Sequence, residues 1–208
     1  MIKYLLPICL FLLVVHPGCH SKDPQGKKPV VAVVEKKPGL FIDSSIKQLA
    51  LAEIDSIWSG FSSAKLNLTY FREGKPADIM FTSGADLQHS AMYRYQHDTA
   101  EILLVSMLNM YGGFRINVCK DSASVYYNFF PTHKTRAFKK SMNDSAYLPG
   151  IDIPCSFHLI LNKKKYEGDE PIFGYIEATS DDFYQKDSSG DKRESIRFRG
   201  YFNAIYIR

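Results

Sequence analysis

The stretch ESIRFRGYFNAIYI, residues 194–207, carries the clearest strand pattern in this 208-residue chain. Successive side chains of a strand point to opposite faces, so its alternation of apolar and polar residues predicts a strand buried on one face. Gly200 within it, and Gly174 upstream, predict a bulge or close contact with a large aromatic side chain. The apolar face is expected to hold Ile196, Phe198, Phe202, Ala204 and Tyr206, and the other face Arg197, Arg199 and Asn203.

Similar patterns upstream predict further strands, several of them joined as hairpins. A long basic stretch, residues 131–154, separates two of these strands and is unusual in length for a loop without a function. The predicted strands cover residues 65–71, 78–82, 114–119, 124–130, 155–162 and 171–180.

Two helices are also predicted. Apolar residues recur every three or four positions from Ile46 to Phe61, behind polar residues suited to capping, as in an amphipathic helix. Asp98 and Glu101 have the spacing of a capping box before the apolar run 102–111, and a Gly-Gly pair follows where a helix would end. Part of that run is equally compatible with a buried strand.

These elements predict an α+β fold. Two helices would accompany an antiparallel β-meander of about six to seven strands, forming a curved sheet or a partly open barrel. Residues 40–208 are long enough to bury a sizeable core and are expected to form one globular domain.

The first 19 residues have the composition of an export signal. Lys3 precedes an uncharged run, residues 4–15, that is shorter than the ~20 apolar residues needed to cross a bilayer but fits a secretory signal. The following Gly18-Cys19 resembles the lipobox of bacterial lipoproteins. The resemblance implies cleavage before Cys19, lipidation of its thiol, and an outer-membrane location with the body facing the periplasm or the cell surface.

The resemblance to the lipobox is incomplete. His16 and Pro17 stand where that family usually has leucine and a small residue. Plain secretion with cleavage after Ser21 is therefore an alternative, because Cys19 and Ser21 fit a small-x-small cleavage site.

Residues 20–39, rich in lysine and proline, predict a flexible tether between anchor and domain. Because Lys3 is the one charged residue of segment 1–19, its removal lowers the formal net charge from +4 to +3. So small an excess gives no reason to expect a nucleic-acid partner. The expected partners are the membrane, through Cys19, and an envelope protein or glycan.

Cys119 and Cys155 are the two cysteines that would remain after cleavage and lipidation. An even number in an oxidising compartment predicts a disulfide between them. Two separate buried thiols are the alternative.

Recognisable catalytic motifs are absent from the sequence, including phosphate-binding glycine loops, Cys-x-x-Cys pairs and nucleophile elbows, so neither a cofactor nor a metal is expected. His89, His97 and Glu101 are the nearest approach to a metal site, but a capping role already explains Glu101. Acidic residues at 177, 181 and 182 are of the type used in acid–base catalysis, and such residues are equally typical of solvated loops.

An aromatic run followed by basic residues is the best candidate for a ligand site. Tyr127 and Phe129 are expected in the core, which leaves Tyr126 and Phe130 on the other face of the strand. Aromatic faces beside cations suit sugars, anionic lipid head groups or a protein partner, and a purely structural pair of aromatic layers is the alternative. The candidate residues are Tyr126, Phe130, His133, Lys134 and Arg136.

The sequence thus predicts a lipid-anchored envelope protein that binds a ligand or partner without catalysis. The competing hypothesis is an exported hydrolase that acts on cell-wall or carbohydrate substrates through Glu177, Asp181 and Asp182.

Overall fold

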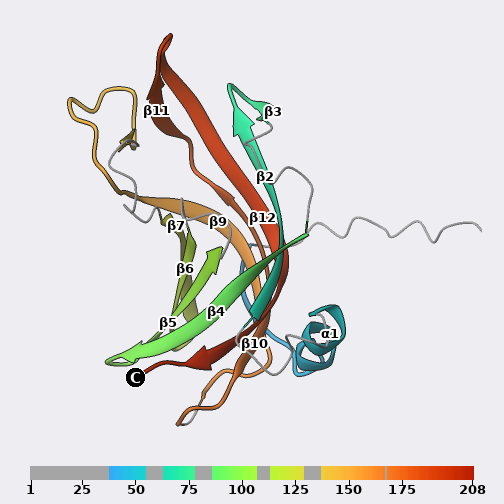
Figure 1. Cartoon of the computed structure of the whole chain (residues 1–208). Coiled ribbons are helices and arrows are strands. Elements are labelled where there is room, and N and C mark those ends of the chain that lie inside the picture. Colours follow the sequence, from blue (N-terminus) through green and yellow to red (C-terminus); the bar gives the residue numbers. More distant parts are fainter. Residues whose placement is uncertain (1–37, 55–62, 78–85, 107–112, 129–136, 167) are drawn as a thin grey trace, which may run out of the picture. The chain divides into compact units, whose positions relative to one another are not determined.

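The computed structural model describes residues 38–54, 63–77, 86–106, 113–128, 137–166 and 168–208, all within the unit Lys36–Arg208. The described chain forms one helix and twelve strands of a single sheet (Figure 1). The predicted α+β fold with two helices and six to seven strands is therefore wrong, because the protein is mostly β. Segment 1–19, with the candidate lipidation site Cys19, lies outside the described residues, as does nearly all of the predicted tether. None of the described segments forms a helix with the length and hydropathy needed to cross a membrane.

The bounds of the elements are β1 Gly39–Ile42, α1 Ile46–Glu53, β2 Ser63–Arg72, β3 Lys75–Ala77, β4 Asp86–Gln96, β5 Thr99–Ser106, β6 Gly113–Cys119, β7 Ser122–Asn128, β8 Phe138–Lys139, β9 Asp152–Leu161, β10 Ile172–Ser180, β11 Phe183–Asp187 and β12 Gly190–Tyr206. Within the described chain, six pairs of consecutive strands lie side by side and antiparallel: β2–β3, β4–β5, β5–β6, β6–β7, β9–β10 and β11–β12.

Eight of the strands close on themselves and are called the ring below: β2, β4, β5, β6, β7, β9, β10 and β12. Each pairs antiparallel with the next, and β12 returns to pair with β2 from Asn203↔Ser63 to Glu194↔Arg72. The other strands extend the sheet at its margins: β3 beside β2, β11 and β8 beyond β12, and β1 parallel to β9. Figure 1 shows the resulting strong curvature of the sheet.

The predicted alternation along the last strand is confirmed in β12. Its apolar residues Ile196, Phe198, Phe202 and Ala204 are fully buried in the core, whereas Arg197 and Arg199 are exposed. Two residues of the predicted faces differ: Asn203, expected on the polar face, is also buried, and Tyr206, expected on the apolar face, is only partly buried. The Phe198 ring stacks on Phe114 of β6, with centroids 3.6 Å apart, so β12 contributes aromatic packing to the core shared with the far strands of the ring.

The predicted close contact at Gly174 is also confirmed. Gly174 of β10 lies directly opposite Phe202 of β12, and a Cβ at Gly174 would sit 2.3 Å from the Phe202 ring. Gly200 allows a different approach, because a Cβ there would sit 1.9 Å from the carbonyl oxygen of Lys65 on β2. Both positions require glycine for lack of space.

The predicted second helix, residues 98–111, is wrong. Residues 99–106 form β5, and Asp98 lies in the turn that joins it to β4; residues 107–111 are outside the described chain. The core face of β5 holds Ala100, Ile102 and Leu104, while Leu103 and Val105 are half-buried on the opposite face. Apolar residues on both faces remove the two-residue period that would have identified a strand.

The predicted first helix is present but shorter than expected. Helix α1 ends at Glu53, where Ile54 turns to an extended conformation, and residues 55–62 lie outside the described part. Ala50 and Ile54 pack against Phe173 of β10, with Tyr201 of β12 beside them. The helix therefore covers part of the outer face of the ring, next to β10 in Figure 1.

The predicted disulfide is absent, because Cys119 and Cys155 are both free thiols. The strand register gives the reason. Pro154, next to Cys155, pairs with Tyr126 of β7. Tyr126 in turn pairs with Arg115 of β6, which lies four residues before Cys119. The two cysteines are thus two strands and about three residues apart, or roughly 14 Å, twice the ~7 Å limit for the Cα atoms of a disulfide.

Candidate functional site

A groove on the outer face of the ring is the best candidate site. It is called the polar groove, has a volume of about 350 Å³, and is lined by Gln96, His97, Thr99, Glu101, Arg115 and Asn117. These residues come from β4, β5, β6 and the β4–β5 turn, in which His97 adopts a positive φ of 57°. The volume falls within the ~300–1,000 Å³ typical of small-molecule sites.

The alternation of the strands places these side chains outside the core. Thr99 and Glu101 alternate along β5 with buried Ala100 and Ile102. Along β6, Arg115 and Asn117 alternate in the same way with buried Phe114, Ile116 and Val118. Glu101 lies directly opposite Asn117, and adjacent strands are ~4.8 Å apart, so the polar residues form a continuous surface.

Glu101 is the most buried of the polar groove residues, with 8% of its surface exposed. Its Oε2 accepts hydrogen bonds from Arg94 Nε at 2.7 Å and from Gln96 Nε2 at 3.1 Å. Within the described chain no donor bonds Oε1. The carboxylate is held firmly through one oxygen, and the other can accept a hydrogen bond from a ligand.

Arg115 borders the polar groove on β6. Its guanidinium forms an ion pair with Asp152 of β9 and lies over the Tyr126 ring, 5.2 Å from the centroid. Its Nε is buried and has no acceptor among the described residues. A buried donor without a partner costs about 1–3 kcal/mol, so a small shift of this side chain toward a ligand oxygen would be favourable.

Three more polar side chains of the groove are uncommitted. In the described structure, the His97 ring, the Thr99 hydroxyl and the Asn117 amide make no hydrogen bond or ion pair. The charges of the groove are balanced, because Glu101 pairs with Arg94 and Arg115 pairs with Asp152. The site thus presents several donors and acceptors without a net charge.

The predicted ligand-site residues are described only at Tyr126. Tyr127 is buried in the core, and Tyr126 lies on the outer face beside Arg115. An aromatic–cation contact was predicted for Tyr126, but with basic residues of the following loop and not with Arg115. The remaining candidates, Phe130, His133, Lys134 and Arg136, lie outside the described residues.

The possible metal ligands are only partly brought together. His97 and Glu101 both line the polar groove, whereas His89 is buried and shares the face of β4 that carries core residues Ala91 and Tyr93. Among the residues that the structure describes, no three His, Cys, Asp or Glu side chains gather closely enough to hold a metal.

The acidic residues of the hydrolase hypothesis lie apart from the polar groove. Glu177 lies in the middle of β10 and accepts a hydrogen bond from the Tyr175 hydroxyl at 3.5 Å. Asp181 and Asp182 are exposed in the turn after β10, where Asp182 lies 3.8 Å from Arg193. None of the three lines the polar groove.

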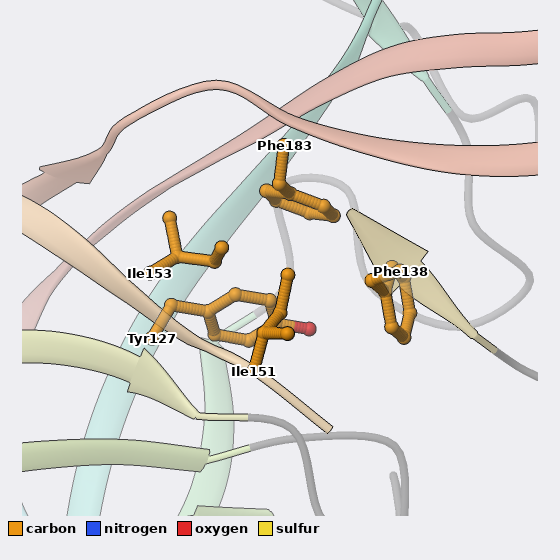
Figure 2. A pocket seen from close by; sticks show the side chains of 5 residues that line it. All are labelled: Tyr127, Phe138, Ile151, Ile153 and Phe183. Atoms are coloured by element: carbon orange, nitrogen blue, oxygen red, sulfur yellow. The ribbon is translucent and has the colours of Figure 1, made fainter. Parts of the chain in front are cut away.

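A second feature is an apolar pocket lined by Tyr127, Phe138, Ile151, Ile153 and Phe183. Figure 2 shows the three rings and two isoleucines facing a common space. The Phe183 centroid lies 5.7 Å from the Tyr127 and Phe138 rings, and the space between the side chains does not admit a water molecule. We interpret this pocket as core packing, because the rings already fill it.

Sequence reasoning missed most of the polar groove. The sequence analysis did not single out Gln96, Thr99, Arg115 or Asn117, although polar residues at alternate positions of residues 113–119 do mark one face of a strand as solvated.

The chain matches no known protein family. A comparison with curated proteins likewise found no relative.

Proposed function

We propose that this protein is an exported, lipid-anchored binding module that holds a neutral saccharide in the polar groove. The observation that carries the proposal is the set of uncommitted hydrogen-bonding groups around one buried carboxylate: Glu101 Oε1, the His97 ring, the Thr99 hydroxyl and the Asn117 amide.

A saccharide suits this set because each hydroxyl both donates and accepts hydrogen bonds. A ligand hydroxyl can donate to Glu101 Oε1 and accept from a neighbouring amide. The balanced ion pairs of Arg94 with Glu101 and Arg115 with Asp152 favour a neutral ligand over an ionic one. The Tyr126 ring next to Arg115 adds an apolar edge of the kind on which sugar rings pack.

Export and anchoring are the second half of the proposal. Their support is the sequence itself: Lys3, the apolar run 4–15 and Gly18-Cys19. A binding module tethered in the envelope would meet cell-wall and surface glycans, which are rich in neutral saccharide units.

The test is to titrate the purified full chain with N,N′-diacetylchitobiose and cellobiose by calorimetry. Thr99→Val and Asn117→Ala each remove one uncommitted polar group without breaking a bond in the described structure. One neutral hydrogen bond contributes about 0.5–1.5 kcal/mol, so each variant should bind about 2- to 10-fold more weakly. Glu101→Gln should weaken binding more, because hydrogen bonds to a charged group contribute about 1.5–3 kcal/mol.

Thr69→Val is the matched control. Thr69 is a half-buried threonine of β2 that does not line the polar groove, so its variant should bind like the wild type. Equal weakening in Thr69→Val and Thr99→Val, or no saccharide binding by the wild type at millimolar concentrations, would rule out the proposed site.

A further inference from the structure

A second groove lies at the C-terminal end of helix α1, on the outer face of strands different from those of the polar groove. It is called the tyrosine groove and has a volume of about 200 Å³. Its residues come from α1, β2, β10 and β12. They are Glu53, Lys65, Asn67, Tyr175, Arg199, Gly200 and Tyr201.

Arg199 gives the tyrosine groove an available cation. Its side chain is exposed on β12 and has no ion pair or hydrogen bond among the described residues. Glu177, an anionic residue that also accepts a hydrogen bond from the Tyr175 hydroxyl, lies opposite it on β10, and within the described residues no ion pair joins the two side chains. The other cation, Lys65, lies 3.8 Å from Glu53, and both side chains are largely solvated, so that pair contributes little.

Two tyrosine rings provide the apolar surface. The centroids of the Tyr175 and Tyr201 rings are 5.0 Å apart, and the ring planes are inclined by 58°, so the rings are tilted against each other and not stacked. Tyr201 is held by its packing against the α1 cluster of Ala50, Ile54 and Phe173. The rings are therefore positioned before any ligand arrives.

Gly200, between Arg199 and Tyr201 in the sequence, brings β12 close to the backbone of β2. A side chain is excluded there, because its Cβ would lie 1.9 Å from the Lys65 carbonyl oxygen. Arg199 and Tyr201 alternate along β12 with the core residues Phe198 and Phe202, so both side chains lie on the outer face, where both line the tyrosine groove.

We propose that the tyrosine groove binds an anionic sugar, with the phosphate or carboxylate on Arg199 and the sugar ring against Tyr175 and Tyr201. A guanidinium offers paired donors that match both anions, and the face of a sugar ring packs on an aromatic ring. This inference does not rest on the polar groove, which lies on β4, β5 and β6 and favours a neutral ligand.

Calorimetric titration of the full chain with glucose 6-phosphate tests the proposal, with glucose and inorganic phosphate as comparison ligands. The phosphosugar should bind at least tenfold more tightly than either comparison ligand. Arg199→Gln should weaken its binding at least tenfold. Arg197→Gln is the matched control, because Arg197 lies two residues away on the same face of β12, over the Phe71 ring, and should change affinity less than twofold.

Three results would overturn the proposal: unchanged affinity in Arg199→Gln, phosphate binding as tight as phosphosugar binding, or binding to phosphatidylglycerol vesicles without binding to glucose 6-phosphate. Thr99→Val, in the polar groove, should leave glucose 6-phosphate binding unchanged. Failure at one groove is thereby distinguishable from failure at the other.

Discussion

Replacing Gly174 with alanine introduces a methyl group where the Phe202 ring already lies. The new Cβ would sit 2.3 Å and 2.7 Å from two carbons of that ring and 2.9 Å from the Ile160 carbonyl oxygen. All three distances are shorter than a carbon atom tolerates, so Phe202 must leave its place or the strands must separate. Overpacking of this kind typically costs about 1–3 kcal/mol.

The matching variant Phe202→Ala removes the ring. Phe202 is fully buried, and such a truncation costs about 3–5 kcal/mol. For a protein of this size that loss corresponds to a fall of about 6–20 °C in melting temperature. In the double variant the new methyl group enters the space that the ring has left. The loss of stability in the double variant should therefore be at least about 1 kcal/mol smaller than the sum of the losses in the two single variants.

Chemical denaturation of the wild type and the three variants measures this coupling, with agreement of the m values as the check for two-state unfolding. Arg197→Ala on the exposed face of β12 is the control and should cost less than about 1 kcal/mol, since among the described residues the contact it loses is a cation–π contact with Phe71. Strict additivity of Gly174→Ala and Phe202→Ala would refute the contact, and with it the pairing register of β10 and β12.

Three further predictions concern the cysteines and the last strand. Burial raises the pKa of the Cys155 thiol to about 12, so only about one in 10⁴ of these thiols is ionised at pH 8. Iodoacetamide should therefore label Cys119 first and Cys155 only after unfolding. If neither thiol can be labelled until a reductant is added, the two cysteines form a disulfide and the free-thiol assignment is wrong. Cys19→Ser should move the protein from the membrane fraction to the soluble fraction, and a wild type that is already soluble would contradict anchoring. Deletion of residues 196–208 should yield insoluble or degraded protein, because β2 and β10 would lose their shared partner; a truncated chain that melts like the wild type would disprove this.

Strands with one apolar and one polar face were predictable from the sequence. The β6–β7 hairpin and the buried face of β12 were predicted close to their observed positions, because apolar and polar residues alternate along most of both segments. The same criterion failed for β5, whose outer residues Leu103 and Val105 are also apolar. It failed for β4 as well, because the polar residue His89 lies on the buried face of that strand, together with the small residue Ala91.

The candidate site was harder to predict, because strand register assembles it from segments that are distant in the sequence. Glu101 was explained as a helix cap, yet its carboxylate binds Arg94 and Gln96 across the β4–β5 hairpin. The alternation of residues 113–119 marks Asn117 only as a residue of the solvated face, and it becomes relevant to the site because it lies opposite Glu101. Tyr126 was identified from its face of the strand, but its cationic neighbour Arg115 belongs to β6 and not to the following loop.

The most direct test of the polar groove is a titration of the isotope-labelled full chain with N,N′-diacetylchitobiose, followed by backbone amide NMR. The proposal predicts that the largest shift changes occur at Thr99, Glu101 and Asn117, on adjoining strands. Amides of Tyr175 and Arg199, in the tyrosine groove, should not move. An unchanged spectrum at saturating sugar, or changes confined to the tyrosine groove, would contradict it.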